Sequence, residues 1–397
     1  MQLLRSMVMQ PRWMFLAALT LRMAVLVHLC ATRAPETMWG SNEAGMIARH
    51  LLLDHRFGST FHDYNGLTAW LAPGYPGVVA AVFLVFGIET RMSAVALMAL
   101  NAIFSSLTAL VAYKLGDLIF NRATGLTAGW AWALGPMGAL LPFLIWDTCL
   151  SALILSWAIL TWVTANSTGG WVRSGIIWGL GGLVNPSLLA PLPLLMVCSW
   201  WRDRNSRSSA LVLLSCGMLL LPWCTRNELA FHRVIPIRSN FWAEVYFGNV
   251  DFSLHPLGNS MEYQRLGEIA FVEDLKHGVV EHIRNHPARF AVGTLDRALL
   301  FWILPSSWMA ITIPLAVGAA CGLGLAIRNT GSRSLPILLP LLSYPVIYCI
   351  SYVYARYRHP IEPFMYILAA YAACEGMRVV RKAKARVDGA AFCSSTP

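Results

Sequence analysis

Apolar runs long enough to cross a bilayer dominate this chain, and they limit its fold more than any other feature. Hydrophobic residues make up 57% of the 397 positions and charged residues only 13%, whereas soluble domains have about 25% charged residues. In lipid, each backbone polar group needs a partner within the protein, and a helix supplies one within a single segment. We therefore predict an all-α polytopic membrane protein in which residues 1–397 form a single transmembrane domain.

Ten apolar segments approach the length of a membrane span, which is about 20 residues. They occupy residues 13–31, 92–115, 126–143, 149–165, 171–184, 188–201, 210–223, 308–327, 335–353 and 361–377. A further apolar segment, 77–87, is short and follows two prolines, so we interpret it as an interfacial or re-entrant helix. The predicted architecture is a bundle of about ten transmembrane helices with juxtamembrane helices in the first outer loop.

The distribution of Lys and Arg predicts the orientation of the bundle. If the N-terminus is cytoplasmic, the inner segments are the N-terminus, 114–122, 166–173, 202–209, 328–333 and the C-terminal tail, and all of them carry Lys or Arg. The outside then receives two large loops, 32–91 and 225–297. A membrane crossing at 77–87 would turn the later basic loops outward. We predict a multi-pass protein of the bacterial inner (plasma) membrane, with both termini cytoplasmic and an uncleaved first span.

The net charge of +10 suggests a nucleic-acid partner, but the positions of the cations argue against one. The cations cluster in short loops between apolar runs, which is the pattern that orients a membrane protein. The nine cysteines show no metal-ligand spacing, and most of them lie inside apolar runs. We predict no nucleic-acid partner, no cofactor and no metal site. The partners that remain are the lipid bilayer and molecules that reach the protein from it.

Unusual polar residues gather on the predicted outer face. Glu43 lies in the first outer loop, where Ser41 is a plausible N-cap, and Asp147 lies in a short turn before the span 149–165. Arg356, Arg358 and His359 lie between the last two spans. Arginine suits a lipid-linked phosphate because its planar guanidinium matches phosphate oxygens. A nearby carboxylate can act as general base on an acceptor hydroxyl.

Each of these residues also has a purely structural interpretation. Glu43 can stabilise a helix N-terminus, and Asp147 can cap the following helix. Arg356 and Arg358 can anchor to lipid headgroups, although outward Arg pairs run against the orientation rule and so favour a function. Arg22 lies inside the first span, where a charge costs about 2.5–3.5 kcal/mol on insertion scales. It is a candidate functional residue unless its side chain snorkels to an interface.

In these residues, and over nearly its whole length, the chain resembles the bacterial GT-C glycosyltransferases of the protein O-mannosyltransferase and aminoarabinose-transferase (ArnT) type. The order of several short motifs along the predicted topology carries the resemblance. They are Asn42-Glu43, residues 68–76 with Trp70 and Tyr75, Trp146-Asp147, Asn185-Pro186, Arg226-Asn227, residues 235–240 with Arg238 and Asn240, Gly267-Glu268, His286-Pro287 and residues 356–363.

The resemblance implies an inverting transferase with a polyprenyl-phosphate-linked sugar donor. It places the catalytic acid of the first outer loop at Glu43 and that of the second loop at Asp147. The expected substrate-binding residues are Arg356, Arg358, His359, Arg22, Trp70, Tyr75, Arg238 and Asn240. The acceptor is a protein, a lipid or a glycan. Many relatives carry Asp or paired acids where this chain has Asn42 before a single Glu.

Two other classes of protein fit a polytopic chain of this composition. A transporter or flippase of lipid-linked sugars would be expected to show internal repeats and polar residues at the membrane midplane. The sequence shows no repeat, and Arg22 is its one polar residue of that kind. A non-catalytic subunit that binds lipid phosphate would not need Glu43 and Asp147. The glycosyltransferase interpretation accounts for more of these residues.

Overall fold

A computed structural model describes residues 10–60, 66–203, 206–251, 260–303 and 309–393. The fold is helical, and the described residues contain no strand, only an isolated antiparallel bridge between Gly58 and Leu67. Four stretches are long and apolar enough to cross a membrane: α2 (Pro11–Thr32), α5 (Arg91–Ile119), α11 (Ser206–Phe231) and the continuous segment Met309–Ile350. The chain is thus a multi-pass helical membrane protein. The predicted total of about ten spans is not tested by this observation.

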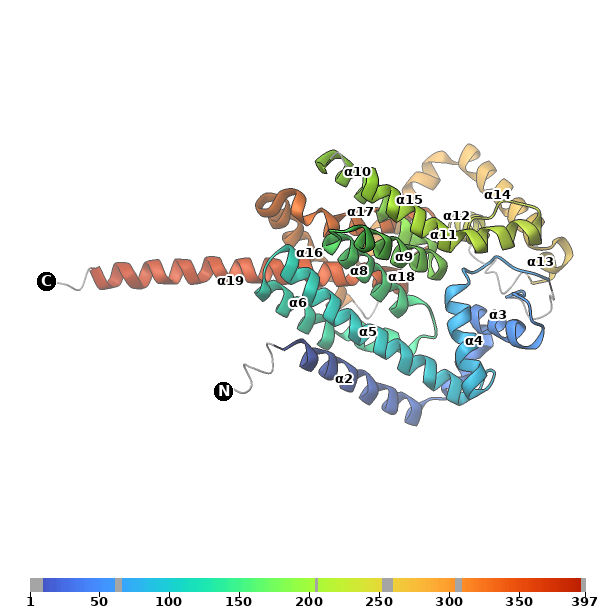
Figure 1. The fold of residues 1–397 in the computed structure, drawn as a ribbon, viewed down its shortest axis with the longest axis horizontal. Helices are drawn as coiled ribbons and strands as arrows, with labels where there is room; N and C mark the ends of the chain where they lie inside the picture. The colour runs from blue at the N-terminus through green and yellow to red at the C-terminus, as the bar shows by residue number, and fades with distance from the viewer. Residues whose placement is uncertain (1–9, 61–65, 204–205, 252–259, 304–308, 394–397) are drawn as a thin grey trace.

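The long helices pack side by side (Figure 1). Helix α5 lies against α2, α6 (Arg122–Leu134) and α8 (Thr148–Thr164). Close approach of α5 and α6 depends on glycine, because a Cβ on Gly116 would lie 2.8 Å from the Cα of Gly125. The other helices of the bundle are α9 (Thr168–Val184), η3 (Pro186–Leu189), α10 (Pro191–Asp203), α16 (Met309–Thr330), η5 (Gly331–Ser334), α17 (Leu335–Ile350), α18 (Ala355–Arg358), η6 (His359–Ile361) and α19 (Glu362–Cys393).

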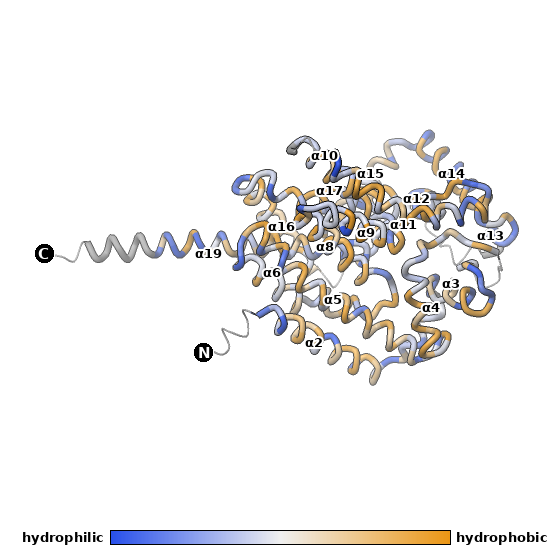
Figure 2. Tube along the Cα trace, viewed as in Figure 1, coloured by the Kyte–Doolittle hydropathy of each residue, from blue (hydrophilic) through white to orange (hydrophobic). Residues whose placement is uncertain are grey.

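Short helices gather at one end of the bundle, opposite the end where α2 begins and α19 leaves it (Figure 1). They are η1 (Pro35–Ser41), α3 (Glu43–Leu53), α4 (Gly74–Phe86), α12 (Phe241–Asn249), α13 (Ser260–Leu266) and α14 (Glu268–Asn285). Apolar residues predominate along the bundle helices, and hydrophilic residues are frequent in α13, in α14 and in the part of α19 that leaves the bundle (Figure 2). Helix α4 packs on α3 and α5 and runs across the direction of α5 (Figure 1).

The predicted span 126–143 is not one continuous helix. Helix α6 ends at Leu134, and the short α7 (Pro136–Leu140) and η2 (Leu141–Phe143) follow. Pro136 causes the break, because it has no N–H to donate to the carbonyl four residues earlier. Arg22 from α2 donates to the carbonyls of Trp132 (3.3 Å) and Ala133 (2.9 Å) instead. The intramembrane Arg22 therefore donates hydrogen bonds to the carbonyls at the end of α6, and its side chain does not snorkel to an interface.

Two other predictions differ from the structure, the start of the second outer loop and the N-cap of α3. Helix α11 continues to Phe231, although the sequence places the start of that loop at 225. Helix α14 ends at Asn285, and α15 (Pro287–Ile303) begins with the next proline. The N-cap of α3 is Asn42, not Ser41, because its side chain accepts from the Gly45 N–H at 2.7 Å. Trp308, the predicted start of a span, lies outside the described residues.

Candidate active site

A cavity of about 680 Å³ lies where the short helices meet the bundle. Segments far apart in the sequence form its walls, including α3, η3, α12, α17 and the turn of α18. Six of the ten predicted site residues line it: Glu43, Tyr75, Asp147, Arg238, Asn240 and Arg356. Tertiary folding therefore brings together residues that are separated by more than 300 positions in the chain.

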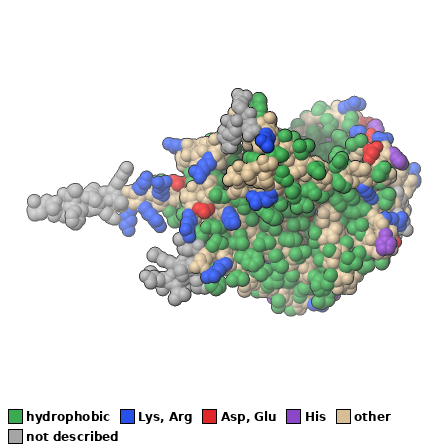
Figure 3. Space-filling model, in the orientation of Figure 1, with side chains coloured by type: hydrophobic (Ala, Val, Ile, Leu, Met, Phe, Trp, Pro, Cys, Tyr) green, Lys and Arg blue, Asp and Glu red, His purple; other side chains and the backbone are tan. Residues whose placement is uncertain are grey.

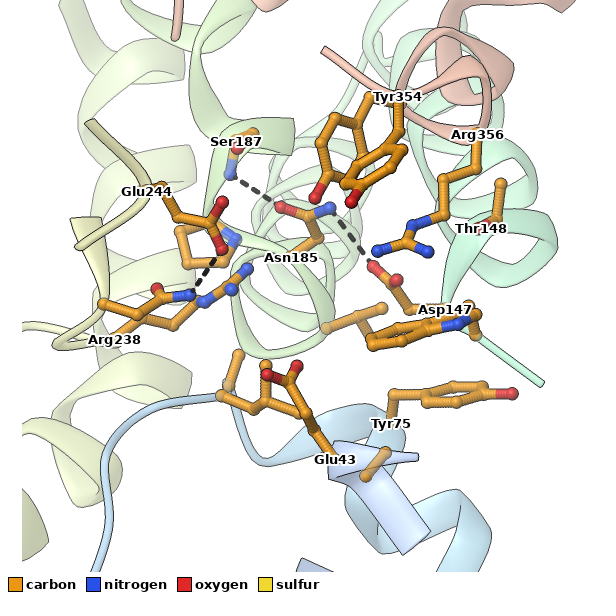
Figure 4. Close-up of a pocket in the computed structure, with 18 of the residues that line it drawn as sticks. Glu43, Tyr75, Asp147, Thr148, Asn185, Ser187, Arg238, Glu244, Tyr354 and Arg356 are labelled. Atoms are coloured by element: carbon orange, nitrogen blue, oxygen red, sulfur yellow. Dashed lines mark hydrogen bonds between the residues drawn. The ribbon is translucent and has the colours of Figure 1, made fainter. Parts of the chain in front are cut away.

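Glu43 is the first residue of α3, and Asn42 fixes its place. The Asn42 amide group donates to the Ile145 carbonyl (2.7 Å), while its oxygen caps the helix. The half-buried Glu43 side chain points into the cavity (Figure 4) and accepts from the indole N–H of Trp70 at 3.2 Å. The sequence correctly predicts Glu43 in the first helical turn. The Glu43 carboxylate therefore accepts a hydrogen bond from the Trp70 side chain, besides lying at the positive end of the helix dipole.

Asp147 immediately precedes α8, yet its side chain makes no capping bond to the helix backbone. Its Oδ2 accepts instead from the Asn185 amide at 3.1 Å and from the Ser151 hydroxyl at 3.0 Å. Asn185 is itself fixed at the start of η3, where its oxygen accepts from the Ser187 N–H at 3.1 Å. Asp147 therefore does not cap α8, and its side chain is instead held at the cavity wall by Asn185 and Ser151.

Arg356 lies beside Asp147 in the cavity (Figure 4). Aromatic rings surround its guanidinium, with the ring centroid of Trp146 at 4.2 Å, Tyr354 at 4.9 Å and Tyr357 at 5.2 Å. Burial lowers the pKa of Arg356, but Tyr357 and the carboxylates of Glu43 and Asp147 more than offset this, so the net shift is upward. The cavity thus holds a permanent positive charge whose orientation is restricted by aromatic rings.

The opposite wall carries Arg238, Asn240 and a carboxylate that the sequence interpretation missed, Glu244. The Asn240 amide donates to Glu244 at 3.2 Å, and Arg238 donates to the Trp70 carbonyl at 3.3 Å. Burial raises the pKa of Glu244, Arg238 lowers it and Glu43 raises it further. The signal that could have revealed Glu244 is a single acid within the otherwise apolar stretch 241–248.

Trp70 is not part of the cavity lining but connects two of its walls. Its indole N–H holds Glu43, and its carbonyl holds Arg238. The ring is 1% exposed and packs against Tyr263 of α13 and Phe271 of α14, with centroids 6.0 and 6.5 Å away. Trp70 therefore positions catalytic candidates rather than contacting a substrate in the cavity.

Glu268 anchors this arrangement from the first turn of α14. Its side chain is 3% exposed. Its two oxygens accept from Thr68 Oγ1 (2.5 Å), the Ala69 N–H (2.8 Å), Ser239 Oγ (2.7 Å) and the Tyr263 hydroxyl (2.6 Å). Thr68 and Ala69 precede Trp70, and Ser239 lies between Arg238 and Asn240. One buried carboxylate thus ties both segments to α14.

Besides Trp70, three predicted substrate-binding residues lie away from the cavity lining. Arg358 and His359 are fully buried and both bind Glu362, at 3.0 Å from Arg358 Nη2 and 2.8 Å from His359 Nδ1. Arg358 also donates to the Trp302 carbonyl at 2.7 Å. Their place in the structure is inside the helix packing, not on a membrane surface. Arg22, the third of these residues, donates hydrogen bonds to backbone carbonyls at the C-terminal end of α6.

The cavity carboxylates do not form a ligand set for a metal ion. Across the part of the chain that the structure describes, no three or more His, Cys, Asp or Glu side chains group closely enough to hold one. Asp147 is bound to Asn185 and Ser151, and Glu43 to Trp70.

No family model matches the chain, and no curated protein matches it in sequence. Solved structures of the Archaeoglobus fulgidus oligosaccharyltransferase are similar in fold. The apo form has a TM-score of 0.56 at 12% identity, covering 95% of this chain and 52% of that one. The AglB complex with an inhibitory peptide and a dolichol-phosphate has a TM-score of 0.54 at 13% identity, covering 89% and 48%. The complex with Zn and sulfate has a TM-score of 0.53 at 16% identity, covering 91% and 47%.

The chain spans about half the length of these oligosaccharyltransferase chains. At such low identity the likeness concerns the fold alone and does not distinguish the protein O-mannosyltransferase branch from other branches. The chain therefore shares its fold with about half of the Archaeoglobus fulgidus oligosaccharyltransferase chain.

Proposed function

We propose that this protein is an integral-membrane inverting glycosyltransferase. It takes a sugar from a polyprenyl-phosphate-linked donor and transfers it to an acceptor on the periplasmic face of the bacterial inner membrane. The observation that carries the proposal is the convergence of Glu43, Asp147 and Arg356 in one cavity. A carboxylate base and a fixed cation are what such a transfer requires.

In the proposed reaction the Glu43 carboxylate takes the proton from the attacking group of the acceptor, and the Trp70 indole N–H fixes the orientation of that carboxylate. The acceptor atom forms a bond to the anomeric carbon from the face opposite the phosphate. The bond between that carbon and the phosphate oxygen breaks, and its electron pair stays with the phosphate. The products are the glycosylated acceptor with inverted configuration and the polyprenyl phosphate, while protonated Glu43 returns its proton to water.

Arg356 neutralises the negative charge that grows on the departing phosphate. Its position among three aromatic rings limits its reorientation, so the charge is already in place before the bond breaks. Asp147 is the second catalytic acid in this proposal. It lies beside Arg356 and keeps that guanidinium oriented, while Asn185 fixes Asp147 in turn. Tyr75, Arg238 and Asn240 complete the substrate-binding wall.

Two further observations support the donor and the orientation. One similar structure of the archaeal oligosaccharyltransferase is a complex with a dolichol-phosphate and an inhibitory peptide, which makes a lipid-phosphate donor and a peptide acceptor reasonable here. Figure 3 shows an apolar band between an end rich in Lys and Arg, from which α19 emerges, and an end where acids and histidines are also present. By the positive-inside rule the first end is cytoplasmic, and the cavity is at the other.

The test compares envelope glycans, glycolipids and glycoproteins by mass spectrometry in cells that lack the gene and cells complemented with variants. Wild type should restore a sugar modification that the deletion removes. Glu43→Gln keeps the shape and removes the basic site, so product formation should fall by about 10²–10⁴-fold. Glu89→Gln removes an acid of the same loop that pairs with Arg49 outside the cavity, and it should behave as wild type. Full restoration by Glu43→Gln would refute the assignment of the base.

A further inference from the structure

A second cavity, of about 510 Å³, lies at the opposite end of the bundle, between the start of α6 and the middle of α19. The hydroxyl of Thr127 lies 3.7 Å from the sulfur of Cys374, which places the two helices in contact at this point. We call this cavity the α6–α19 groove. Its lining is Ala123, Leu126, Thr127, Cys374, Met377, Arg378, Arg381 and Lys382.

The α6–α19 groove combines an apolar floor with a cationic rim. Leu126 and Met377 supply the floor, and three cations, Arg378, Arg381 and Lys382, supply the rim. The lining contains no carboxylate among the described residues. Glu375 lies outside it and pairs with Arg378 at 3.6 Å, but the Arg378 side chain is 66% exposed, so the pair contributes little. The site therefore has a net positive charge next to an uncharged surface.

The N-terminus of α6 adds to the attraction for an anion. Asn121 caps this helix by accepting from the Thr124 N–H at 2.9 Å, and the first turn of α6 contains no acid. The positive end of the helix dipole therefore points toward the end of the groove that the cations surround. Three side-chain charges and a helix N-terminus favour an anion of phosphate type.

The position of the groove along α19 indicates which kind of molecule bears the anionic group. The apolar part of α19 ends near Met377, and the cations begin at Arg378. This is the level at which a spanning helix passes from acyl chains to headgroups, and it lies at the Lys- and Arg-rich end of the molecule (Figure 3). We propose that the α6–α19 groove binds an anionic phospholipid, with its headgroup phosphate on Arg381 and Lys382 and its glycerol and acyl chains over Leu126 and Met377. Basic sites between helices at the inner membrane surface suit such headgroups.

Native mass spectrometry of the purified protein, after reconstitution in phosphatidylcholine vesicles with and without phosphatidylglycerol, tests this proposal. Wild type should retain phosphatidylglycerol in preference to phosphatidylcholine. The double variant Arg381→Gln/Lys382→Gln should bind it on the order of ten-fold more weakly. The matched control Lys114→Gln/Arg328→Gln also removes two exposed charges, from the C-terminal parts of α5 and α16 outside the groove, and should bind as wild type.

Three results would overturn the proposal. Equal loss in the groove variant and the control would show diffuse attraction to the whole basic end rather than a site. Displacement of the lipid by millimolar inorganic phosphate would show that the groove recognises the free anion and that the apolar floor adds nothing. Absence of retained phosphatidylglycerol on the wild type would also refute it. The proposal does not depend on the glycosyltransferase assignment, since no readout involves turnover.

Discussion

Replacing Glu268 with Gln tests whether α14 holds the candidate active-site cavity in shape. Four hydrogen bonds converge on this carboxylate, from Thr68, Ala69, Ser239 and Tyr263. Gln keeps the size of the side chain but has one acceptor oxygen and an NH₂ group that can only donate. Hydroxyl donors can rotate and accept from that group, whereas the Ala69 N–H cannot. The amide oxygen must therefore face Ala69, which leaves Thr68 and Tyr263 to reverse their roles.

The magnitude follows from the loss of charge. A hydrogen bond to a charged group contributes about 1.5–3 kcal/mol, and a neutral one about 0.5–1.5 kcal/mol. A loss of about 1 kcal/mol at each bond gives about 4 kcal/mol, and relief from burying the charge offsets part of this. We expect Glu268→Gln to cost about 2–4 kcal/mol of stability. Because Trp70 follows the released segment, Glu43 and Arg238 should also lose their fixed positions.

The assay measures the apparent unfolding temperature of the purified protein and product formation in complemented cells. Glu273→Gln is the control, because that acid lies on the same helix with its side chain 42% exposed and pairs only with its neighbours Lys276 and His277 among the described ion pairs. Glu268→Gln should unfold several degrees lower and give less product, and the control should do neither. A wild-type unfolding temperature and full product in Glu268→Gln would refute the reasoning.

Three other predictions follow from the site and the fold. Arg356→Ala should weaken binding of undecaprenyl phosphate by about ten-fold or more and leave the unfolding temperature unchanged. Arg358→Ala should lower the unfolding temperature, because it leaves the buried Glu362 carboxylate without this cation. Equal behaviour of the two variants would contradict this prediction. Since the pKa of Glu244 is raised on folding, its charge destabilises the protein increasingly above about pH 4.5, so Glu244→Gln should raise the unfolding temperature at neutral pH but not near about pH 4. A cysteine at position 89 should be labelled from outside and one at position 121 should not, and the reverse pattern would invert the topology.

The sequence predicts the membrane class and the positions of Glu43 and Asp147 well, because helix caps and interruptions in apolar runs are local signals. It does not separate Arg356 from Arg358. Arg356 and Arg358 are two residues apart, so their side chains point about 200° apart around the helix. The Arg356 side chain enters the cavity, while the Arg358 side chain is buried against Glu362. That difference arises only from tertiary packing. Glu244 is a single acid in an apolar stretch, but only tertiary packing shows that it lines the same cavity as Glu43 and Arg356.

The break in the helix at Pro136 also has a consequence for biogenesis. Arg22 enters the membrane with the first helix, but its acceptors besides its own helix are Ser105, Trp132 and Ala133, which the ribosome makes much later. Until they arrive, the translocon must hold a charged helix whose insertion cost of about 2.5–3.5 kcal/mol is not yet offset. We therefore expect the first helix to enter the lipid together with the α5–α6 pair. A nascent chain truncated before residue 122 would be the species most exposed to membrane quality control.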